Sequence, residues 1–94
     1  MYDAWFKEYF PYLEIDGVWS ILPDTAHFLY CLVQELQPKY ILEFGSGVST
    51  AVIAKSASSY GGYVYSLEHQ KVWLERTQSM CQACSLNNFE CLSG

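Results

Sequence analysis

Residues 41–50 have the sequence ILEFGSGVST, and this stretch decides the fold. It begins inside the apolar run 40–44, which lies between Pro38 and Gly45 and is typical of a strand buried on both faces. Two glycines, Gly45 and Gly47, then allow a tight turn and let the backbone approach a ligand closely. The stretch therefore predicts a strand that runs into a ligand-binding loop.

A helix is expected directly after this loop. Ser49 or Thr50 can cap it, and the helix formers that follow continue to about Ser58. The free N–H groups at the start of such a helix point at the ligand and carry a partial positive charge. Strand, glycine loop and helix together predict a nucleotide-cofactor site.

Further elements are predicted on both sides of the loop. A helix begins near Pro23 with Asp24 as its N-cap, and Pro38 ends it. Its apolar positions at helical spacing are Leu29, Leu32, Val33 and Leu36. The other expected elements are a short aromatic helix broken near Pro11, a turn at Asp16-Gly17, a strand over 63–67, a helix over about 71–84 and a third strand from Phe89.

Strands that alternate with helices pair in parallel through right-handed crossovers. The sequence therefore predicts an α/β fold, a partial doubly wound (Rossmann-like) parallel sheet with strand order 3-2-1, preceded by N-terminal helices. The 94 residues suffice for one small domain. We expect a single partial domain, with a helical segment over 1–38 and a cofactor-binding β-α-β-α-β half over 39–94.

Composition excludes several functions. The net charge is −5, and the five basic residues are scattered, so no nucleic-acid-binding platform is expected in this segment. No apolar run is long enough to span a membrane, and the first residues do not resemble a signal peptide. We expect a cytoplasmic protein whose four cysteines are reduced. Because 51% of the residues are hydrophobic, part of the apolar surface is expected to serve contacts outside these residues.

An acidic residue strengthens the prediction of a cofactor site. Glu68 ends the second predicted strand, 23 positions after Gly45. A carboxylate at this position can accept hydrogen bonds from both hydroxyls of an adenosine ribose. The alternative is a structural glycine-rich turn with a solvated Glu68.

The residues around the glycines distinguish between nucleotides. Dinucleotide sites usually have a third glycine, but Thr50 stands at that position, and Glu43 lies two residues before Gly45. A carboxylate beside a diphosphate is repulsive, whereas beside an ammonium or sulfonium group it is favourable. These residues therefore favour a cationic cofactor without phosphate.

At these residues the sequence resembles a known family. The run 43–50 looks like the first motif of class I S-adenosylmethionine-dependent methyltransferases, in its E-x-G-x-G-x-S-T form. The run 65–69, with Trp73 soon after, looks like the family's second-strand motif, and the helix from Leu22 to Gln37 matches the helix that leads into the first motif. The resemblance covers roughly residues 17–92.

The resemblance implies S-adenosylmethionine as the cofactor and assigns a role to individual residues. Glu43 would hold the methionine amino group, Gly45 and Gly47 would line the methionine portion, and Glu68 would bind the ribose hydroxyls. His69 would lie against the adenine or ribose. The implied cofactor-binding set is completed by Ser46, Ser49 and Thr50, the last two as helix caps that can reach the methionine carboxylate.

The resemblance also limits what this chain can show. Members of the family have more strands than are predicted here, so we expect the N-terminal, cofactor-binding half of such an enzyme, with catalytic residues and methyl acceptor unknown. This chain alone is not expected to be active. In a 3-2-1 sheet the strand 40–44 has a bare edge, through which we expect self-association.

Other signals are weaker. Cys81 and Cys84 have C-x-x-C spacing but fall inside a predicted helix and lack a second ligand pair, so we predict no metal site. His27 lies in a helix and is interpreted as a bystander. The alternative functions are a nicotinamide-dinucleotide-binding oxidoreductase half-domain and a non-catalytic Rossmann-like interaction module.

Overall fold

A computed structural model of the chain describes residues 1–11 and 22–94. The elements in chain order are α1 (Asp3–Tyr9), α2 (Pro23–Leu36), β1 (Tyr40–Phe44), α3 (Val48–Ser58), β2 (Tyr63–Glu68), α4 (Lys71–Ala83) and β3 (Phe89–Ser93). They match the expected elements, α1 as the short aromatic helix included. The predicted turn at Asp16-Gly17 lies outside the described residues.

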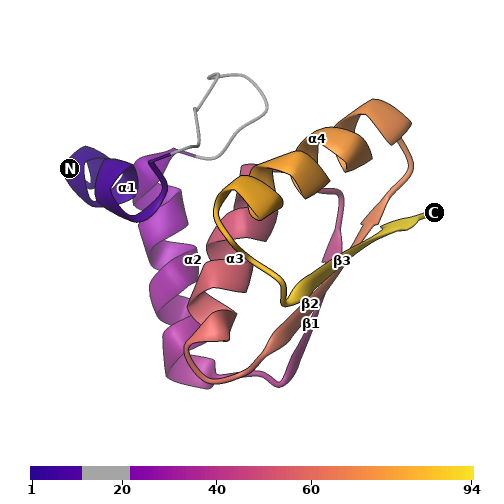
Figure 1. Cartoon of the computed structure of the whole chain (residues 1–94). Coiled ribbons are helices and arrows are strands. Elements are labelled where there is room, and N and C mark those ends of the chain that lie inside the picture. The colour runs from indigo at the N-terminus through magenta and orange to yellow at the C-terminus, as the bar shows by residue number, and fades with distance from the viewer. Residues whose placement is uncertain (12–21) are drawn as a thin grey trace.

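The three strands form one parallel sheet in the order β1-β2-β3, which confirms the predicted α/β fold and the 3-2-1 order. Phe44 pairs with Leu67, and Leu67 pairs with Leu92, so the carboxyl ends of the strands lie at the same edge. Helices α2, α3 and α4 lie on one side of the sheet (Figure 1). Alternate residues of β2, namely Val64, Ser66 and Glu68, are buried beneath them.

Helix α3 forms the centre of the core. Its small side chains Ala51, Ala54 and Ala57 are fully buried, which lets α2 and α4 pack closely on either side. The contact with α2 is also polar: the Ser56 hydroxyl donates to the Tyr30 carbonyl at 2.6 Å, and Gln34 Nε2 donates to the Ser56 carbonyl at 2.8 Å. Helix α3 therefore holds the loop before it in a fixed place.

The N-terminal aromatic side chains pack together. Phe6 and Phe10 are buried, and Trp5 lies edge-on to Tyr30 at 5.5 Å between ring centroids. The ring of Tyr2 stacks on His27 at 3.8 Å. This cluster joins α1 to α2, so the aromatic side chains stabilise the fold through burial.

The predicted helix caps are wrong in detail. Leu22 is the N-cap of α2 and Pro23 is the first helical residue, because the fixed φ of proline suits that position. The carboxylate of Asp24 instead accepts from the Tyr2 N–H at 3.3 Å, and so links α1 to α2. Helix α3 has Gly47 as its N-cap.

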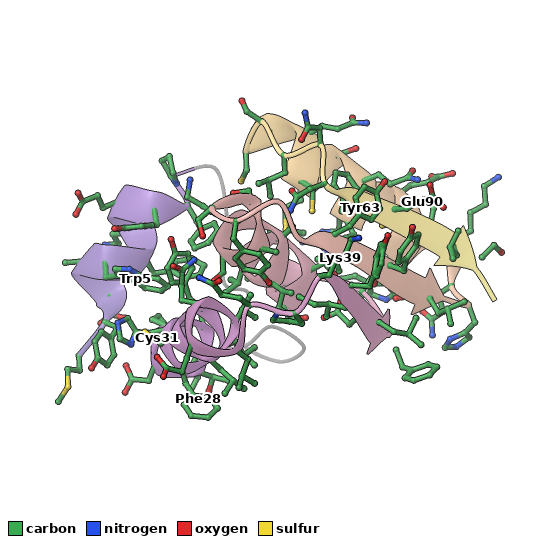
Figure 2. All side chains as sticks on the ribbon, turned by 90° about the horizontal axis from the view of Figure 1, so that it is seen from below. Trp5, Phe28, Cys31, Lys39, Tyr63 and Glu90 are labelled. Carbon is green, nitrogen blue, oxygen red and sulfur yellow. The ribbon has the colours of Figure 1, made fainter. Side chains whose placement is uncertain are left out.

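The buried face of α2 also differs from the prediction. Ala26 and Val33 are buried, but Leu32 and Leu36 are 40% and 67% exposed. The stripe that packs on α3 follows Ala26, Tyr30 and Val33, with spacings of four and three residues. In Figure 2 Phe28 points away from the body of the molecule, in agreement with its exposed fraction of 62%.

Strand β1 is not buried on both faces, contrary to the prediction. Leu42 and Phe44 are 58% and 79% exposed, because α2, α3 and α4, the described helices that cover the sheet, all lie on its other face. Figure 2 shows Tyr63 and Glu90 side by side on the neighbouring strands β2 and β3. That the exposed Leu42 and Phe44 side chains serve further contacts stays a prediction. Self-association through the β1 edge stays a prediction.

Candidate functional site

The sheet brings both predicted cofactor motifs to one edge. The Gly45 N–H donates to the Leu67 carbonyl at 2.7 Å, so the loop after β1 lies against the end of β2. Glu68 is the last residue of β2 and therefore lies beneath this loop. The two motifs that carry the predicted site residues converge at this edge. They span Glu43 to Thr50 and Glu68 to His69.

The glycine loop has the conformation that its sequence predicts. Gly45 has a φ of +89°, a left-handed value that other residues adopt only with strain. No atom lies within 4 Å of a Cβ placed on Gly45 or on Gly47, so the space beside both residues is open. The loop can therefore approach a ligand without a side chain between them.

Glu43 is held by hydroxyl groups from two elements. Ser49 Oγ donates to Glu43 Oε2 at 2.6 Å, and Thr50 Oγ1 and Ser66 Oγ donate to Oε1. Thr50 Oγ1 also accepts from the Gly47 N–H at 3.2 Å. Ser49 and Thr50 therefore tie the first turn of α3 to β1, and the carboxylate fixes the loop between them.

Glu68 is buried beneath the loop, with 6% of its surface exposed. Its Oε1 accepts from the Ser46 N–H at 2.9 Å and from the Ser46 hydroxyl at 2.8 Å, and its Oε2 accepts from the Gln70 N–H at 3.1 Å. Burial raises the pKa of Glu68, but the hydrogen bonds from Ser46 and Gln70 outweigh it and leave the pKa lowered. Glu68 is therefore ionised at neutral pH.

His69 lies at the surface of the same edge. Its Nδ1 is 3.7 Å from Glu68 Oε2, and its side chain is 76% exposed. A ring in this position is free to turn toward a ligand bound at the edge. The contact with Glu68 joins it to the rest of the site.

Sequence reasoning missed three contributors to this network. Ser66 is fully buried and lies 2.7 Å from the Gly45 carbonyl, Thr77 of α4 donates to Ser46 Oγ at 3.0 Å, and Gln70 donates its backbone N–H to Glu68. A hydroxyl in the middle of the β2 apolar run was the available signal for Ser66. Thr77 could have been noticed because it lies one helical turn after Trp73 on the apolar side of its helix.

The arrangement suits a cation better than a phosphate. Two carboxylates lie close to the loop: Glu68 contacts Ser46 within it, and Glu43 contacts the first turn of the helix that follows it. An ionised carboxylate a few ångströms from a diphosphate costs electrostatic energy, whereas a nearby ammonium or sulfonium gains it. Glu68 Oε1 also accepts from a hydroxyl group, that of Ser46, and acceptance from hydroxyl groups is the chemistry of a ribose site.

The four cysteines differ in burial: Cys81 is buried, Cys84 and Cys91 are partly buried, and Cys31 is exposed. Over residues 1–11 and 22–94, no group of three or more His, Cys, Asp and Glu side chains gathers closely enough to hold a metal ion. All four cysteines are free thiols. Burial, the largest cause, raises the pKa of Cys81 to about 12, so this thiol stays protonated inside the core. Cys81 therefore acts as a small apolar side chain.

No family model matches the chain, and no curated protein matches it. A crystal structure of cofactor-bound Rv0187 from MTB matches with a TM-score of 0.77 and 26% identity, over 83% of this chain and 37% of that one. The O-methyltransferase from Bacillus cereus in complex with SAH matches with a TM-score of 0.77 and 24% identity, over 98% of this chain and 49% of that one. The O-methyltransferase TomG from Streptomyces achromogenes, in complex with SAM, matches with a TM-score of 0.73 and 20% identity, over 80% of this chain and 34% of that one.

These matches confirm the predicted α/β fold, which the chain shares with the two O-methyltransferases that hold SAM or SAH. The chain spans between 34% and 49% of the length of the three structures. No helix within the described ranges combines the length and apolar character needed to cross a membrane.

Proposed function

We propose that this chain is the S-adenosylmethionine-binding half of a class I methyltransferase. The observation that carries the proposal is Glu68, an ionised carboxylate directly beneath a glycine loop with open space beside it. Two of the matched O-methyltransferases hold SAM or SAH. The second carboxylate, Glu43, makes the same loop unfavourable for a diphosphate.

Each part of the site has a proposed role toward this cofactor. Gly45 and Gly47 let the backbone lie against the methionine portion, and Ser46, Ser49 and Thr50 shape the loop around it. Glu43 places negative charge on the side of the ammonium group. Glu68 accepts from the ribose, and His69 covers the adenosine from the exposed side.

The chemistry is transfer of the sulfonium methyl group to a nucleophile. The carbon–sulfur bond breaks as the bond to the acceptor forms, and S-adenosylhomocysteine remains. This segment supplies binding and orientation of the cofactor. We place the protein in the cytoplasm, a location that the four free thiols support.

Calorimetric titration separates the proposed function from its alternatives. We expect saturable binding of S-adenosylhomocysteine with one site per chain, and no binding of NAD at the same concentrations. Binding of NAD alone would favour an oxidoreductase half-domain. A folded protein that binds neither ligand would favour an interaction module that lacks cofactor chemistry.

A further inference from the structure

A buried chain of hydroxyl groups connects α4 to the carboxylate of Glu68. Thr77 lies in the middle of α4, and its side chain is fully buried. Its Oγ1 donates to Ser46 Oγ at 3.0 Å, and Ser46 Oγ donates to Glu68 Oε1 at 2.8 Å. The connection spans three elements: helix α4, the glycine loop and the end of β2.

The distances show which group donates to which along this series of hydrogen bonds. Ser46 has one hydroxyl proton and two acceptors near it, Glu68 Oε1 at 2.8 Å and the Trp73 carbonyl at 3.5 Å. The shorter contact, to a charged acceptor, is the stronger one. The Ser46 oxygen is then available to accept from Thr77. Hydrogen bonds arranged in this head-to-tail order polarise and strengthen one another.

The hydrogen-bond chain leaves the two oxygens of Glu68 with different numbers of donors. A carboxylate has about four lone-pair positions, two on each oxygen. The hydroxyl and the N–H of Ser46 both donate to Oε1, while Oε2 accepts from the Gln70 N–H. Oε1 is therefore saturated by the loop, and Oε2 retains acceptor capacity.

We propose that Thr77 is a positioning residue for ribose binding. It orients the Ser46 hydroxyl, Ser46 anchors Oε1 of Glu68, and Oε2 is thereby presented to a ribose hydroxyl. This inference rests on the proposed function, because it needs Glu68 to bind the ribose. Without Thr77 the Ser46 proton can turn to the Trp73 carbonyl, and the carboxylate loses part of what fixes its side-chain rotamer.

The test compares two substitutions of similar size at this position. Thr77→Val keeps the branched shape and removes the proton donor, whereas Thr77→Ser keeps the donor and removes a methyl group. We expect Thr77→Val to weaken S-adenosylhomocysteine binding by about five- to tenfold, the value of one hydrogen bond to a polar network. We expect Thr77→Ser to bind within about twofold of the wild type. Calorimetry measures the affinities, and thermal unfolding confirms that each variant is folded.

Two further arms separate positioning from packing. Adenosine and 2′,3′-dideoxyadenosine serve as probes, and Thr77→Val should weaken binding of adenosine while leaving the dideoxy compound unaffected. In a Ser46→Ala background, Thr77→Val should cause no additional loss of affinity, because the hydrogen bond from Thr77 to Ser46 is already absent. The same background also serves if the Thr77→Val single variant fails to fold.

The outcomes distinguish this inference from the proposed function. Wild-type binding of S-adenosylhomocysteine together with an unchanged affinity in Thr77→Val would overturn the positioning role alone. Equal losses in Thr77→Val and Thr77→Ser, or equal losses for both nucleosides, would also overturn it and indicate a packing role. No binding by the wild type would overturn the proposed function itself.

Discussion

Replacing Glu68 by alanine is expected to weaken S-adenosylhomocysteine binding by about 30-fold or more. Hydrogen bonds to a charged group contribute about 1.5–3 kcal/mol, and the variant removes the acceptor for the ribose. It also leaves the Ser46 N–H and hydroxyl without the carboxylate that holds them, so the loop loses its support from β2. Calorimetric titration of wild type and variant measures the loss.

A charge-matched control is available on the same sheet. Glu90 of β3 is exposed and pairs with Tyr65, at a distance along the strand from the carboxyl edge. Glu90→Ala removes the same charge and is expected to leave the affinity within about twofold, since exposed charges contribute little to local binding. Equal losses in the two variants would show that Glu68 acts through net charge and not through contact.

The lowered pKa of Glu68 adds a pH dependence with a definite sign. The folded carboxyl group titrates below its unfolded value of about 4.3, so its contribution to the free energy of unfolding is present above that pH. The contribution is lost as the pH falls through the lowered folded pKa. The contribution of Glu68 to the affinity for S-adenosylhomocysteine should therefore stay constant from about pH 8 to about pH 6, which calorimetric titration of the wild type and Glu68→Ala at both pH values measures.

Gly45→Ala is expected to reduce both stability and cofactor affinity. A φ of +89° is strained for alanine and costs about 1–2 kcal/mol of folding free energy. The added methyl group also enters the open space beside the loop, where the methionine portion is proposed to lie. We expect about a tenfold loss of affinity, which corresponds to about 1.4 kcal/mol. Thermal unfolding and calorimetry on the same sample measure the two effects.

Gly61→Ala separates the two effects. Gly61 has a φ of +84° and likewise has no atom within 4 Å of an added Cβ, but it lies in the turn before β2, at the opposite edge of the sheet. Its substitution should cost similar stability and leave the affinity unchanged. A comparable loss of affinity in both variants would mean that strain in the backbone, and not ligand contact, explains the result for Gly45.

The local signals in the sequence predicted most of the fold. The strand over 40–44 and the helix that begins at Lys71 agree with β1 and α4, because glycine, proline and apolar runs act over a few residues. The caps were less predictable. Ser49 and Thr50 were expected to cap α3. Gly47 is the N-cap, Thr50 Oγ1 contributes by accepting from the Gly47 N–H, and the Ser49 hydroxyl donates to Glu43, a contact that depends on how β1 lies against the helix.

The convergence of the two motifs could be predicted from the sequence, but the hydrogen bonds between them could not. Glu43 and Glu68 could be assigned to the loop from strand ends alone, since parallel strands bring their carboxyl ends to one edge. Ser66 and Thr77 could not, because a buried hydroxyl is informative only when its partner across the fold is known. The exposure of Leu42 and Phe44 was likewise unpredictable, because an apolar strand does not show how many of its faces helices cover.

An NMR titration with S-adenosylhomocysteine locates the bound cofactor on the chain residue by residue. We expect the backbone amide signals of Gly45, Ser46, Gly47 and Gln70 to shift most as the ligand saturates the ¹⁵N-labelled protein. Smaller shifts are expected at the opposite edge, around Gly61. Saturable binding that leaves the loop amides unmoved and shifts residues elsewhere would contradict the assignment of the cofactor site to residues 43–50 and Glu68.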